Sequence, residues 1–333
     1  MKKLRAGIIG LGRIASLYEK DGRAKKYYPF LTHAGAYFKH PSIEVVCGAD
    51  IDTKRLQAFR KMWGTERLYR DYEEMLEENM LDILSICTHP ELHYPIIQSA
   101  AGRAGVIFCE KPFALNSREI RSIIRLCGKT GTKITVNLYR EYDRSHGAVR
   151  TLLKQRCYGE LQRINCFYGK GLRNMGSHML GYLIGTLGMP GKITVLGRRR
   201  YSGIEEDTYD VYLEFRGGIP AMLQACDFNN YRLFEMDFVC QSGRIQIADE
   251  GLTFRFFESR PNRAESGARE LLETRRGVKS TIGNALFYAV DHLAALSRKA
   301  GTKPIVSPEA YLGIQKVIEE IEQQGGKMPC IQS

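Results

Sequence analysis

The sequence predicts two successive architectures, an α/β domain with a doubly wound parallel sheet and then an α+β domain with a large open antiparallel sheet. In the first half, short apolar runs alternate with helical patterns, as they do in βαβ units. In the second half, the strand-like runs are longer, and turn residues such as Arg216-Gly217-Gly218 separate them. A chain of 333 residues is long enough for two domains. We place them at residues 1–125 and 126–333.

The first half carries five apolar runs that we expect to form the parallel strands. Near-continuous hydrophobic segments suit strands that are covered on both faces. The runs lie at residues 4–10, 43–49, 83–87, 106–109 and 134–136. Helical patterns lie between them at residues 53–63, 72–78, 91–101 and 116–128. This alternation is typical of a parallel sheet with helices on both faces.

The second half is expected to form one sheet followed by two helices. The strand-like runs lie at residues 161–168, 209–215, 220–227, 234–240 and 244–248. Helical patterns follow at residues 285–298 and 309–323, and Ser307 with Pro308 forms a plausible helix start. The segment 261–279 is polar and charged, and we expect a surface loop there.

Composition and charge narrow the class of protein. Lysine and arginine exceed aspartate and glutamate by 49 to 37, a net charge of +12, which favours phosphate-bearing small molecules or other anions. The basic residues are dispersed, however, so a solvated basic surface is the simpler interpretation. No nucleic-acid motif accompanies them, and we expect no nucleic-acid partner. No apolar run approaches the ~20 residues of a membrane span, so we expect no membrane partner either.

The cysteines and histidines indicate neither disulfides nor a metal site. The nine cysteines are an odd number and contain no C-x-x-C pair. Those at 47, 87 and 109 lie inside apolar runs and are interpreted as buried hydrophobes in a reducing cytoplasm. The amino-terminal residues lead directly into a strand, which leaves no room for a secretory signal. We therefore expect a cytoplasmic protein without a bound metal.

The first predicted strand ends in the turn Gly10-Leu11-Gly12-Arg13-Ile14-Ala15, which has the form G-x-G-x-x-A. The first glycine allows the tight turn, the second lets the backbone approach a pyrophosphate, and a small third residue lets helix and strand pack closely. Because a strand precedes it and a helix follows, this is a Rossmann-type dinucleotide site. We predict that Gly10, Gly12, Arg13 and Ile14 line it.

An acidic residue at the end of the second strand bears on which dinucleotide is bound. Asp50 occupies that position, but it lies further from the glycines than the usual ~20 residues. The excess is explained if residues 18–30 are an insertion and the helix resumes at Thr32-His33-Ala34. A carboxylate there accepts the ribose 2′-hydroxyl and repels a 2′-phosphate, which favours NAD over NADP. The alternative is that Asp50 only caps the next helix.

Four segments together resemble the Gfo/Idh/MocA oxidoreductases. They are the glycine turn, the stretch Ser85 to Pro90 with His93, the triplet Glu110-Lys111-Pro112, and Gly176-Ser177-His178. The resemblance extends over almost the whole chain. It implies a nicotinamide cofactor on the first domain, a sugar or polyol substrate on the second, and a homodimer or homotetramer. The segment Lys170 to Arg173 is similar to members that act in surface-glycan pathways.

The resemblance also implies roles for individual residues. Thr88, Pro90 and His93 would line the cofactor cleft, and Glu110 and Lys111 would border the nicotinamide. Two further residues, Asn137 and Arg140, match a segment that lies near cofactor and substrate in the family.

Oxidising a sugar hydroxyl requires a base and a group that stabilises the developing alkoxide. His178 suits the base because imidazole titrates near neutrality, although it also fits a hydrogen-bonded core histidine. Lys111 either stabilises the alkoxide as an ammonium or, with its pKa lowered by burial, acts as the base. The alternative role for Lys111 is a surface ion pair with Glu110. Both residues are expected to meet the same substrate from opposite lobes.

The sequence departs from the family pattern around His178. Asn174 and Gly181 stand where the family carries aspartates. An amide orients a ligand but cannot raise the pKa of a histidine as a carboxylate does. Three functions therefore stay open: a sugar dehydrogenase or ketoreductase, a non-redox epimerase or lyase that retains its cofactor, and a regulatory protein that binds NAD without turnover.

Three cations accompany the predicted substrate site. Arg140, Lys170 and Arg173 suit a phosphate or a nucleotide diphosphate, because planar guanidinium groups match phosphate oxygens. The alternative is that these residues only decorate the mouth of a basic cleft. Together with Lys111, Asn174 and His178 they form the predicted substrate site.

Overall fold

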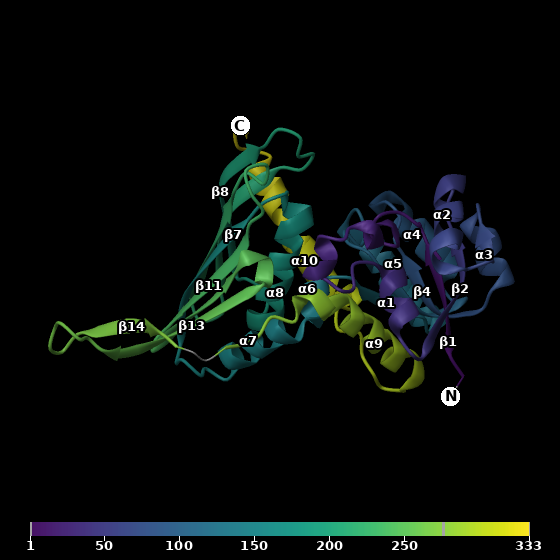
Figure 1. The fold of residues 1–333 in the computed structure, drawn as a ribbon. Helices are drawn as coiled ribbons and strands as arrows, with labels where there is room; N and C mark the ends of the chain where they lie inside the picture. Colours follow the sequence, from purple (N-terminus) through teal and green to yellow (C-terminus); the bar gives the residue numbers. More distant parts are fainter. Residues whose placement is uncertain (1, 275–276, 333) are drawn as a thin grey trace. The chain divides into compact units, whose positions relative to one another are not determined.

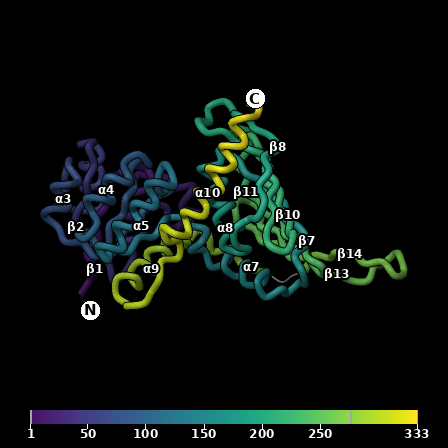
Figure 2. Tube along the Cα trace, turned by 180° about the vertical axis from the view of Figure 1, so that it is seen from behind, coloured from purple at the N-terminus to yellow at the C-terminus, as the bar shows by residue number. Residues whose placement is uncertain are grey.

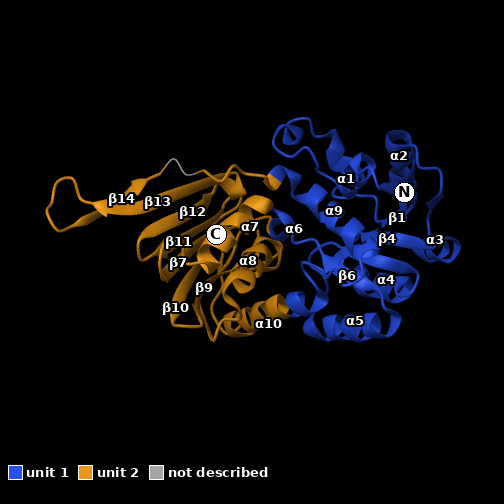
Figure 3. Cartoon of the chain, turned by 90° about the horizontal axis from the view of Figure 1, so that it is seen from below, with its two compact units in different colours: residues 1–143, 283–312 blue, residues 144–282, 313–333 orange. Residues whose placement is uncertain are grey.

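In the computed structural model, which describes residues 2–274 and 277–332, the chain divides into two compact units (Figure 3). Unit 1 contains residues Met1–Asp143 and Gly283–Leu312, and unit 2 contains Arg144–Ile282 and Gly313–Ser333. This division differs from the predicted boundary at residue 125, which lies inside helix α5 (Ser117–Thr130). The reason is that the chain returns to unit 1, where α9 (Ala285–Arg298) packs on the first sheet.

The sheet of unit 1 confirms the predicted doubly wound topology. Its six strands are all parallel, and their order is β3-β2-β1-β4-β5-β6. The order reverses between β1 and β4, so the connections that follow these two strands leave toward opposite faces of the sheet. Such a reversal creates a crevice at the carboxyl ends of the strands that suits a ligand. The strands are β1 (Leu4–Ile9), β2 (Ile43–Ala49), β3 (Leu68–Tyr69), β4 (Leu81–Ile86), β5 (Ala104–Cys109) and β6 (Lys133–Val136).

Helices cover both faces of this sheet (Figures 1 and 3). α1 (His33–Lys39), α2 (Thr53–Trp63) and α9 lie on one face, and α3 (Tyr72–Glu78), α4 (His93–Ala100) and α5 lie on the other. Polar side chains fix where the helices begin, because Asp52, Asp71 and Asn116 each accept a hydrogen bond from a first-turn N–H group. The short helix α6 (Tyr139–Tyr142) follows β6.

The predicted insertion after the glycine turn is present. The backbone N–H groups of His33 and Ala34 donate to the carbonyls of Ile14 and Ala15, so the chain resumes where it left off. Residues 16–32 form a lobe with two short 3-10 turns, η1 (Leu17–Lys20) and η2 (Ala24–Lys26). The inserted residues therefore lengthen the spacing to Asp50 without moving the second strand.

The sheet of unit 2 has nine strands and is mixed, whereas we predicted an antiparallel one. Its order is β14-β13-β12-β11-β7-β10-β9-β8-β15, and the pairs β10–β7 and β15–β8 are parallel. The strands are β7 (Leu161–Tyr168), β8 (Lys192–Arg200), β9 (Thr208–Phe215), β10 (Ile219–Ala225), β11 (Phe234–Cys240), β12 (Gly243–Ala248), β13 (Thr253–Pro261), β14 (Arg269–Glu273) and β15 (Ile331–Gln332).

The expected loop at 261–279 is wrong in part, because residues 269–273 form strand β14 and make a hairpin with β13. Strand β14 pairs with the end of β13, from Phe257 opposite Glu273 to Pro261 opposite Arg269. Because β12 begins opposite Glu258, the tip of this hairpin is a two-stranded ribbon that projects beyond the rest of unit 2 (Figure 2). Residues 275–276 of the predicted loop lie outside the described residues.

Burial alternates along the strands of unit 2, so one face of its sheet is covered and the other is open. α7 (Arg144–Lys154), α8 (Ser177–Leu187) and α10 (Pro308–Gly325) lie on the covered face (Figure 1). α10 starts as predicted, with the Ser307 hydroxyl accepting from the Ala310 N–H group at 3.3 Å. A single π-helical turn, η4 (Leu172–Gly176), leads directly into α8. No helix in the described ranges is long and apolar enough to cross a membrane.

Candidate cofactor and substrate site

The glycine turn lies at the crevice between β1 and β4. Gly10 has a φ of +83°, and a Cβ atom there would lie 2.8 Å from the backbone carbonyl carbon of Cys87. A side chain at this position is therefore excluded by both conformation and space. Above Gly12 the space is open, since only an Arg55 nitrogen lies within 4 Å of its virtual Cβ, at 3.7 Å. The arrangement fits a pyrophosphate that approaches the backbone.

The other residues of the turn are held from the inserted lobe. The guanidinium carbon of Arg13 lies 4.3 Å from the ring centroid of Tyr18, and the Ile14 carbonyl accepts the His33 N–H group. The backbone N–H groups of Ser16 and Leu17 turn back to the Gly12 carbonyl, which begins a helical turn at the second glycine. The predicted cofactor residues thus lie together along the glycine turn, which we call the rim. They are Gly10, Gly12, Arg13 and Ile14.

Asp50 directly follows β2, and its carboxylate contacts this rim. Its Oδ2 atom accepts the Leu11 N–H group at 2.7 Å, and its Oδ1 atom accepts the Asp52 N–H group at 2.9 Å. The helix cap is Asp52, which accepts the Lys54 N–H group at 2.8 Å, so the alternative in which Asp50 caps α2 is wrong. An Arg55 nitrogen lies 3.4 Å from Asp50 Oδ2.

Two buried oxygen atoms at the same edge of the sheet have no hydrogen-bond partner among the described residues. They are Thr88 Oγ1, which follows β4, and Asn137 Oδ1, which follows β6. Buried polar atoms are normally hydrogen-bonded, so a pair of them at the carboxyl ends of parallel strands points to a ligand with polar groups. Thr88 lies beside the glycine turn, with its methyl carbon 2.9 Å from the virtual Cβ of Gly10, which is consistent with a dinucleotide bound at that turn.

Pro90 and His93 fix the conformation of the loops after β4 and β5. They do not offer unbonded polar groups to a ligand. Pro90 begins the 3-10 turn η3 (Pro90–Leu92), which leads into α4. The His93 ring is fully buried, with Nδ1 2.9 Å from the Pro112 carbonyl and Nε2 3.2 Å from the Thr88 carbonyl. Burial lowers the pKa of His93 even though these carbonyls favour the cation. This ring ties the loop after β4 to the loop after β5.

Glu110 is the centre of a buried polar cluster at the end of β5. Its Oε1 atom accepts hydrogen bonds from Asn137 Nδ2 at 2.6 Å and lies 2.9 Å from His33 Nε2. Its Oε2 atom accepts the N–H group of Lys111 at 3.2 Å. Burial alone would raise the pKa of the Glu110 carboxyl, but the bonds from His33 and Asn137 and the Lys111 charge hold it below its usual range.

Glu110 is only 8% exposed, so an ion pair of Glu110 with Lys111 would not lie at the surface as the alternative expected. The backbone of Lys111 is held in place, because its own N–H group donates to the carboxylate of Glu110. Arg140, on α6, has its guanidinium carbon 4.7 Å from the Tyr139 ring centroid. Both cations belong to unit 1, as do the predicted cofactor residues.

The remaining predicted substrate residues belong to unit 2 and lie along one stretch of chain. Lys170 has a φ of +58° and lies 5.7 Å from the Phe228 ring centroid. Arg173 and Asn174 lie in the π-helical turn, and His178 lies in the first turn of α8. Arg173 forms a two-pronged ion pair with Glu322 of α10, at 2.7 and 2.6 Å.

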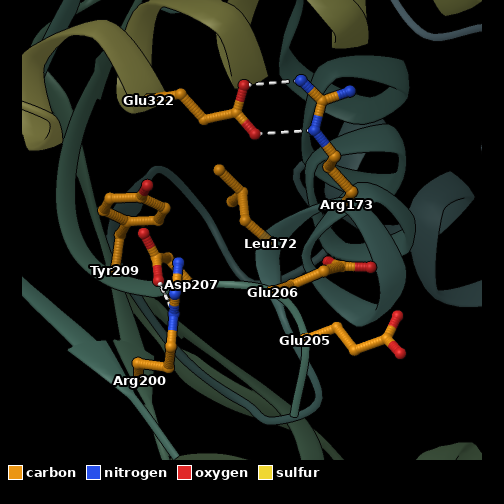
Figure 4. A pocket seen from close by; sticks show the side chains of 8 residues that line it. All are labelled: Leu172, Arg173, Arg200, Glu205, Glu206, Asp207, Tyr209 and Glu322. Atoms are coloured by element: carbon orange, nitrogen blue, oxygen red, sulfur yellow. Dashed lines mark hydrogen bonds and ion pairs between the residues drawn. The ribbon is translucent and has the colours of Figure 1, made fainter. Parts of the chain in front are cut away.

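A carboxylate from the loop before β9 reaches the backbone of Asn174. Glu206 Oε2 accepts the Asn174 N–H group at 3.0 Å, and the absence of a side chain at Gly171 makes room for it. This acid and Glu322 border a cavity of about 360 Å³ in unit 2 (Figure 4). The lining residues are Leu172, Arg173, Arg200, Glu205, Glu206, Asp207, Tyr209 and Glu322. Alternating carboxylate and guanidinium groups suit a ligand with many hydroxyls.

Sequence reasoning missed several polar partners of the predicted residues. These are His33, Tyr37 and Ser85 around Glu110 in unit 1, and Glu206 and Glu322 in unit 2. The expected position of the helix at Thr32-His33 was the one indication that His33 lies near the glycine turn. Within the described ranges, no group of three or more His, Cys, Asp or Glu residues could hold a metal ion.

The fold and these residues define a dinucleotide-binding protein with a separate second unit, and comparisons with known proteins agree. Residues 4–138 match the model of the GFO_IDH_MocA family, described as an oxidoreductase family with an NAD-binding Rossmann fold. Residues 4–138 thus match the Gfo/Idh/MocA oxidoreductases, and over these residues the resemblance and the NAD-binding Rossmann fold are confirmed.

Individual relatives are distant. The chain is 26% identical over 226 residues to trans-1,2-dihydrobenzene-1,2-diol dehydrogenase of Sus scrofa, covering 62% of this chain and 66% of the relative. It is 33% identical over 105 residues to D-apiose dehydrogenase of Paraburkholderia graminis, covering 32% and 28%. The matches span less than two thirds of these relatives.

Solved structures show the same fold over the full length. One is the WlbA dehydrogenase of Bordetella pertussis in complex with NADH and UDP-GlcNAcA. It has a TM-score of 0.76 at 16% identity and covers 98% of this chain and 97% of the solved one. The two-unit architecture is therefore that of known oxidoreductases.

Proposed function

We propose that the protein is an NAD-dependent oxidoreductase that transfers a hydride between the nicotinamide and a hydroxyl-bearing or ketone carbon of a sugar. The observation that carries this proposal is the buried carboxylate of Glu110, which fixes Lys111 at the edge of the sheet where the glycine turn and Asp50 also lie. A lysine placed beside the carboxyl ends of parallel strands is well positioned for chemistry on a dinucleotide-bound substrate.

The chain's own groups would divide the work as follows. When bound, NAD supplies the hydride acceptor or donor. Gly10, Gly12 and Asp50 would hold its pyrophosphate and ribose. Lys111, as an ammonium, would donate a hydrogen bond to the substrate oxygen and stabilise charge there. His178 would take the hydroxyl proton, and Asn174 would orient the substrate through its amide.

The substrate class is proposed to be a nucleotide-sugar or phospho-sugar. D-apiose dehydrogenase acts on a sugar by its name, and the WlbA structure contains a nucleotide sugar. The polar cavity of unit 2 supports a polyhydroxylated ligand. The cations Arg140 and Lys170, which do not line this cavity, support an anionic group on the ligand. Arg173 is held by Glu322, so it would serve a phosphate only by exchanging one anion for another.

Turnover assays on purified protein test the proposal. A panel of sugars, sugar phosphates and nucleotide sugars is screened with NAD and with NADP by following NADH or NADPH absorbance. Lys111→Ala should lower turnover about 10²- to 10⁴-fold while leaving NADH binding by fluorescence nearly unchanged. Lys129→Ala, an exposed lysine on α5, is the matched control. Tight NAD binding without turnover on any member of the panel contradicts an ordinary dehydrogenase.

A second candidate is an epimerase or lyase that retains its cofactor. It predicts product formation from a nucleotide sugar with no net change in NADH absorbance. Asn174 and Gly181 replace the acids of the family pattern, so His178 lacks a carboxylate from either position, and this motivates a third candidate that binds NAD without turnover. If mass spectrometry finds no product where absorbance is silent, the remaining candidate is a regulatory protein that binds NAD.

We further propose that the protein is a homodimer or homotetramer that pairs through the open face of the unit 2 sheet. Charged side chains on that face are neutralised across neighbouring strands, as in the ion pairs of Arg244 with Asp237 and Arg199 with Asp210. A chain of +12 would otherwise repel its copy. Light scattering behind size exclusion should give twice or four times the mass of 37.8 kDa, and a monomer contradicts the proposal.

A further inference from the structure

The cluster around Glu110 continues as a chain of hydrogen bonds into the core of unit 1. His33 Nδ1 lies 2.9 Å from the Ser85 hydroxyl, and that hydroxyl lies 2.6 Å from the Tyr37 hydroxyl. Ser85, Tyr37 and His33 are all fully buried. Among the described residues, the Tyr37 hydroxyl has no hydrogen-bond partner other than Ser85. The chain therefore ends at Tyr37.

Counting hydrogens along this chain determines the state of His33. Between His33 Nδ1 and Tyr37 there are two contacts, so two hydrogens satisfy them. The hydroxyls of Ser85 and Tyr37 supply those two: Tyr37 donates to Ser85, and Ser85 donates to Nδ1. A proton on Nδ1 would be a third, and it would leave one buried hydroxyl without an acceptor, which is costly.

The other end of the chain determines which ring nitrogen carries the hydrogen. Glu110 is held in its ionised form by its donors and can only accept hydrogen bonds. Nε2 of His33, 2.9 Å from Glu110 Oε1, must therefore carry a hydrogen and donate it. A bare Nε2 would set a lone pair against a carboxylate oxygen. Asn137 Nδ2 also lies 3.5 Å from Nε2, but it donates to Glu110 Oε1 at the much shorter distance of 2.6 Å. With Nε2–H donating to Glu110, the contact of each group with its nearest partner in this chain holds one hydrogen.

We propose that His33 is a positioning residue that Tyr37 and Ser85 hold as the neutral Nε2–H tautomer, so that the charge of Glu110 is left for Lys111. Asn137, the Lys111 backbone and His33 then solvate the carboxylate with three N–H groups and no formal charge. The inference rests on the proposed role of Lys111, because its consequence is that Lys111 stays an ammonium and acts as hydrogen-bond donor rather than as base.

The groups that face His33 are consistent with this assignment. Tyr37 lies on the same helix, and burial raises its pKa, so its hydroxyl keeps its hydrogen. The Phe108 ring lies 4.9 Å from the His33 ring, centroid to centroid, and brings no charge. Burial raises the pKa of Cys87 and of Cys109, the two thiols next to Glu110 in the fold, so both stay neutral. With His33 neutral, the hydrogen bonds from His33 and Asn137 and the Lys111 charge still lower the pKa of the Glu110 carboxyl.

Nitrogen NMR on protein labelled in histidine tests the tautomer without any substrate. Loss of one signal pair in His33→Gln assigns His33 among the seven histidines. We expect Nε2 protonated and Nδ1 unprotonated at neutral pH. Two protonated nitrogens, or the Nδ1–H tautomer, would overturn the proposal.

Removing the donor to Nδ1 tests the hydroxyl end of the chain. In the double variant Ser85→Ala with Tyr37→Phe, no hydroxyl is left to donate to Nδ1. We expect the signal of the unprotonated Nδ1 to move, because this nitrogen no longer accepts a hydrogen bond. Tyr69→Phe is the control, because the Tyr69 hydroxyl binds Glu78 outside the chain. An unchanged Nδ1 signal in the double variant would contradict the hydrogen bond from Ser85.

The effect on Lys111 is measured separately from turnover. Only an uncharged amine is acylated, so the acetylation rate of the Lys111 peptide, followed by mass spectrometry, reports its charge. His33→Leu should raise that rate several-fold at neutral pH relative to Lys129, and His33→Gln, which keeps an N–H donor for Glu110, should not. Equal rates in His33→Leu and the unaltered protein would overturn the proposal. Absence of turnover would refute the proposed function but not the tautomer.

Discussion

The two units treat their charged groups in opposite ways. In unit 1, Glu110 is buried and its oxygens are held by three N–H groups from His33, Asn137 and Lys111. In unit 2, charged groups pair with each other near solvent, as Arg173 and Glu322 do with side chains 30% and 29% exposed. Water can replace a lost partner of the exposed pairs in unit 2, but it cannot replace a lost partner of the buried Glu110. Burial, rather than the number of charges, should decide what each group contributes to stability.

The largest effect is expected at Glu110. Glu110→Ala leaves buried N–H donors without an acceptor, and we expect the free energy of unfolding to fall by about 2–5 kcal/mol. Urea unfolding at neutral pH measures this. A loss below that of the Glu322 variant described further on would break the comparison between the units.

The pH dependence gives a check on the same residue. The pKa of Glu110 is lowered from its ordinary 4.5, so its contribution is fully present above about that pH and is lost on further acidification. The difference between the unaltered protein and Glu110→Ala should therefore narrow below pH 4.5. Glu110→Gln keeps one acceptor oxygen but turns an amide toward a donor, so its loss should be intermediate.

A buried polar group in unit 2 tests whether the loss of stability depends on burial or on which unit holds the group. The Tyr168 hydroxyl donates to the Tyr209 carbonyl at 2.8 Å and accepts the Tyr209 N–H group at 2.9 Å. Tyr168→Phe leaves both backbone groups without that partner, and we expect a loss of about 1–3 kcal/mol in urea unfolding. A loss near zero would mean that polar groups in unit 2 matter little even when they are buried.

The ion pair between Arg173 and Glu322 should contribute less. Both side chains are partly exposed, so Glu322→Gln should cost no more than about 1 kcal/mol. Raising the salt concentration should shrink the difference further, because exposed charges are screened. A loss that is large and insensitive to salt would show that the cavity beside this pair is drier than its exposure indicates.

The smallest effect is expected at the projecting hairpin. Arg255 and Glu273 form a two-pronged pair at 2.9 and 2.7 Å, but each side chain is 46% exposed. Arg255→Ala should leave the thermal midpoint unchanged within error. Differential scanning fluorimetry on this variant and Glu322→Gln side by side would rank the two exposed pairs.

Regular elements of the fold could be predicted closely from the sequence. Helices at 53–63, 72–78 and 285–298 and strands at 43–49, 161–168 and 234–240 begin and end where expected. Apolar periodicity is a local property, and capping residues such as Asp52 mark helix starts. Whether a strand pairs parallel or antiparallel is not local, which explains why the mixed sheet and the return of α9 to unit 1 were not predicted.

The candidate site shows the same difference between local sequence patterns and contacts between distant residues. The glycine turn, Asp50 and Lys111 could be predicted because each belongs to a short motif or to the end of a strand. The histidine between Glu110 and Ser85 could not, because these contacts join residues 77 and 52 positions apart. The partners of Arg173 and Asn174 were missed for the same reason, as Glu322 and Glu206 lie on distant segments.

The lobe formed by residues 16–32 leaves and rejoins the chain at adjacent points, since His33 bonds to Ile14 and Ala34 to Ala15. Its ends are closed by the fold itself. The entropy of closing a loop grows only slowly with length, by roughly 0.6 kcal/mol per doubling. The lobe can therefore change in length at little entropic cost while the strand ends keep their register, provided that Tyr18 stays beside Arg13.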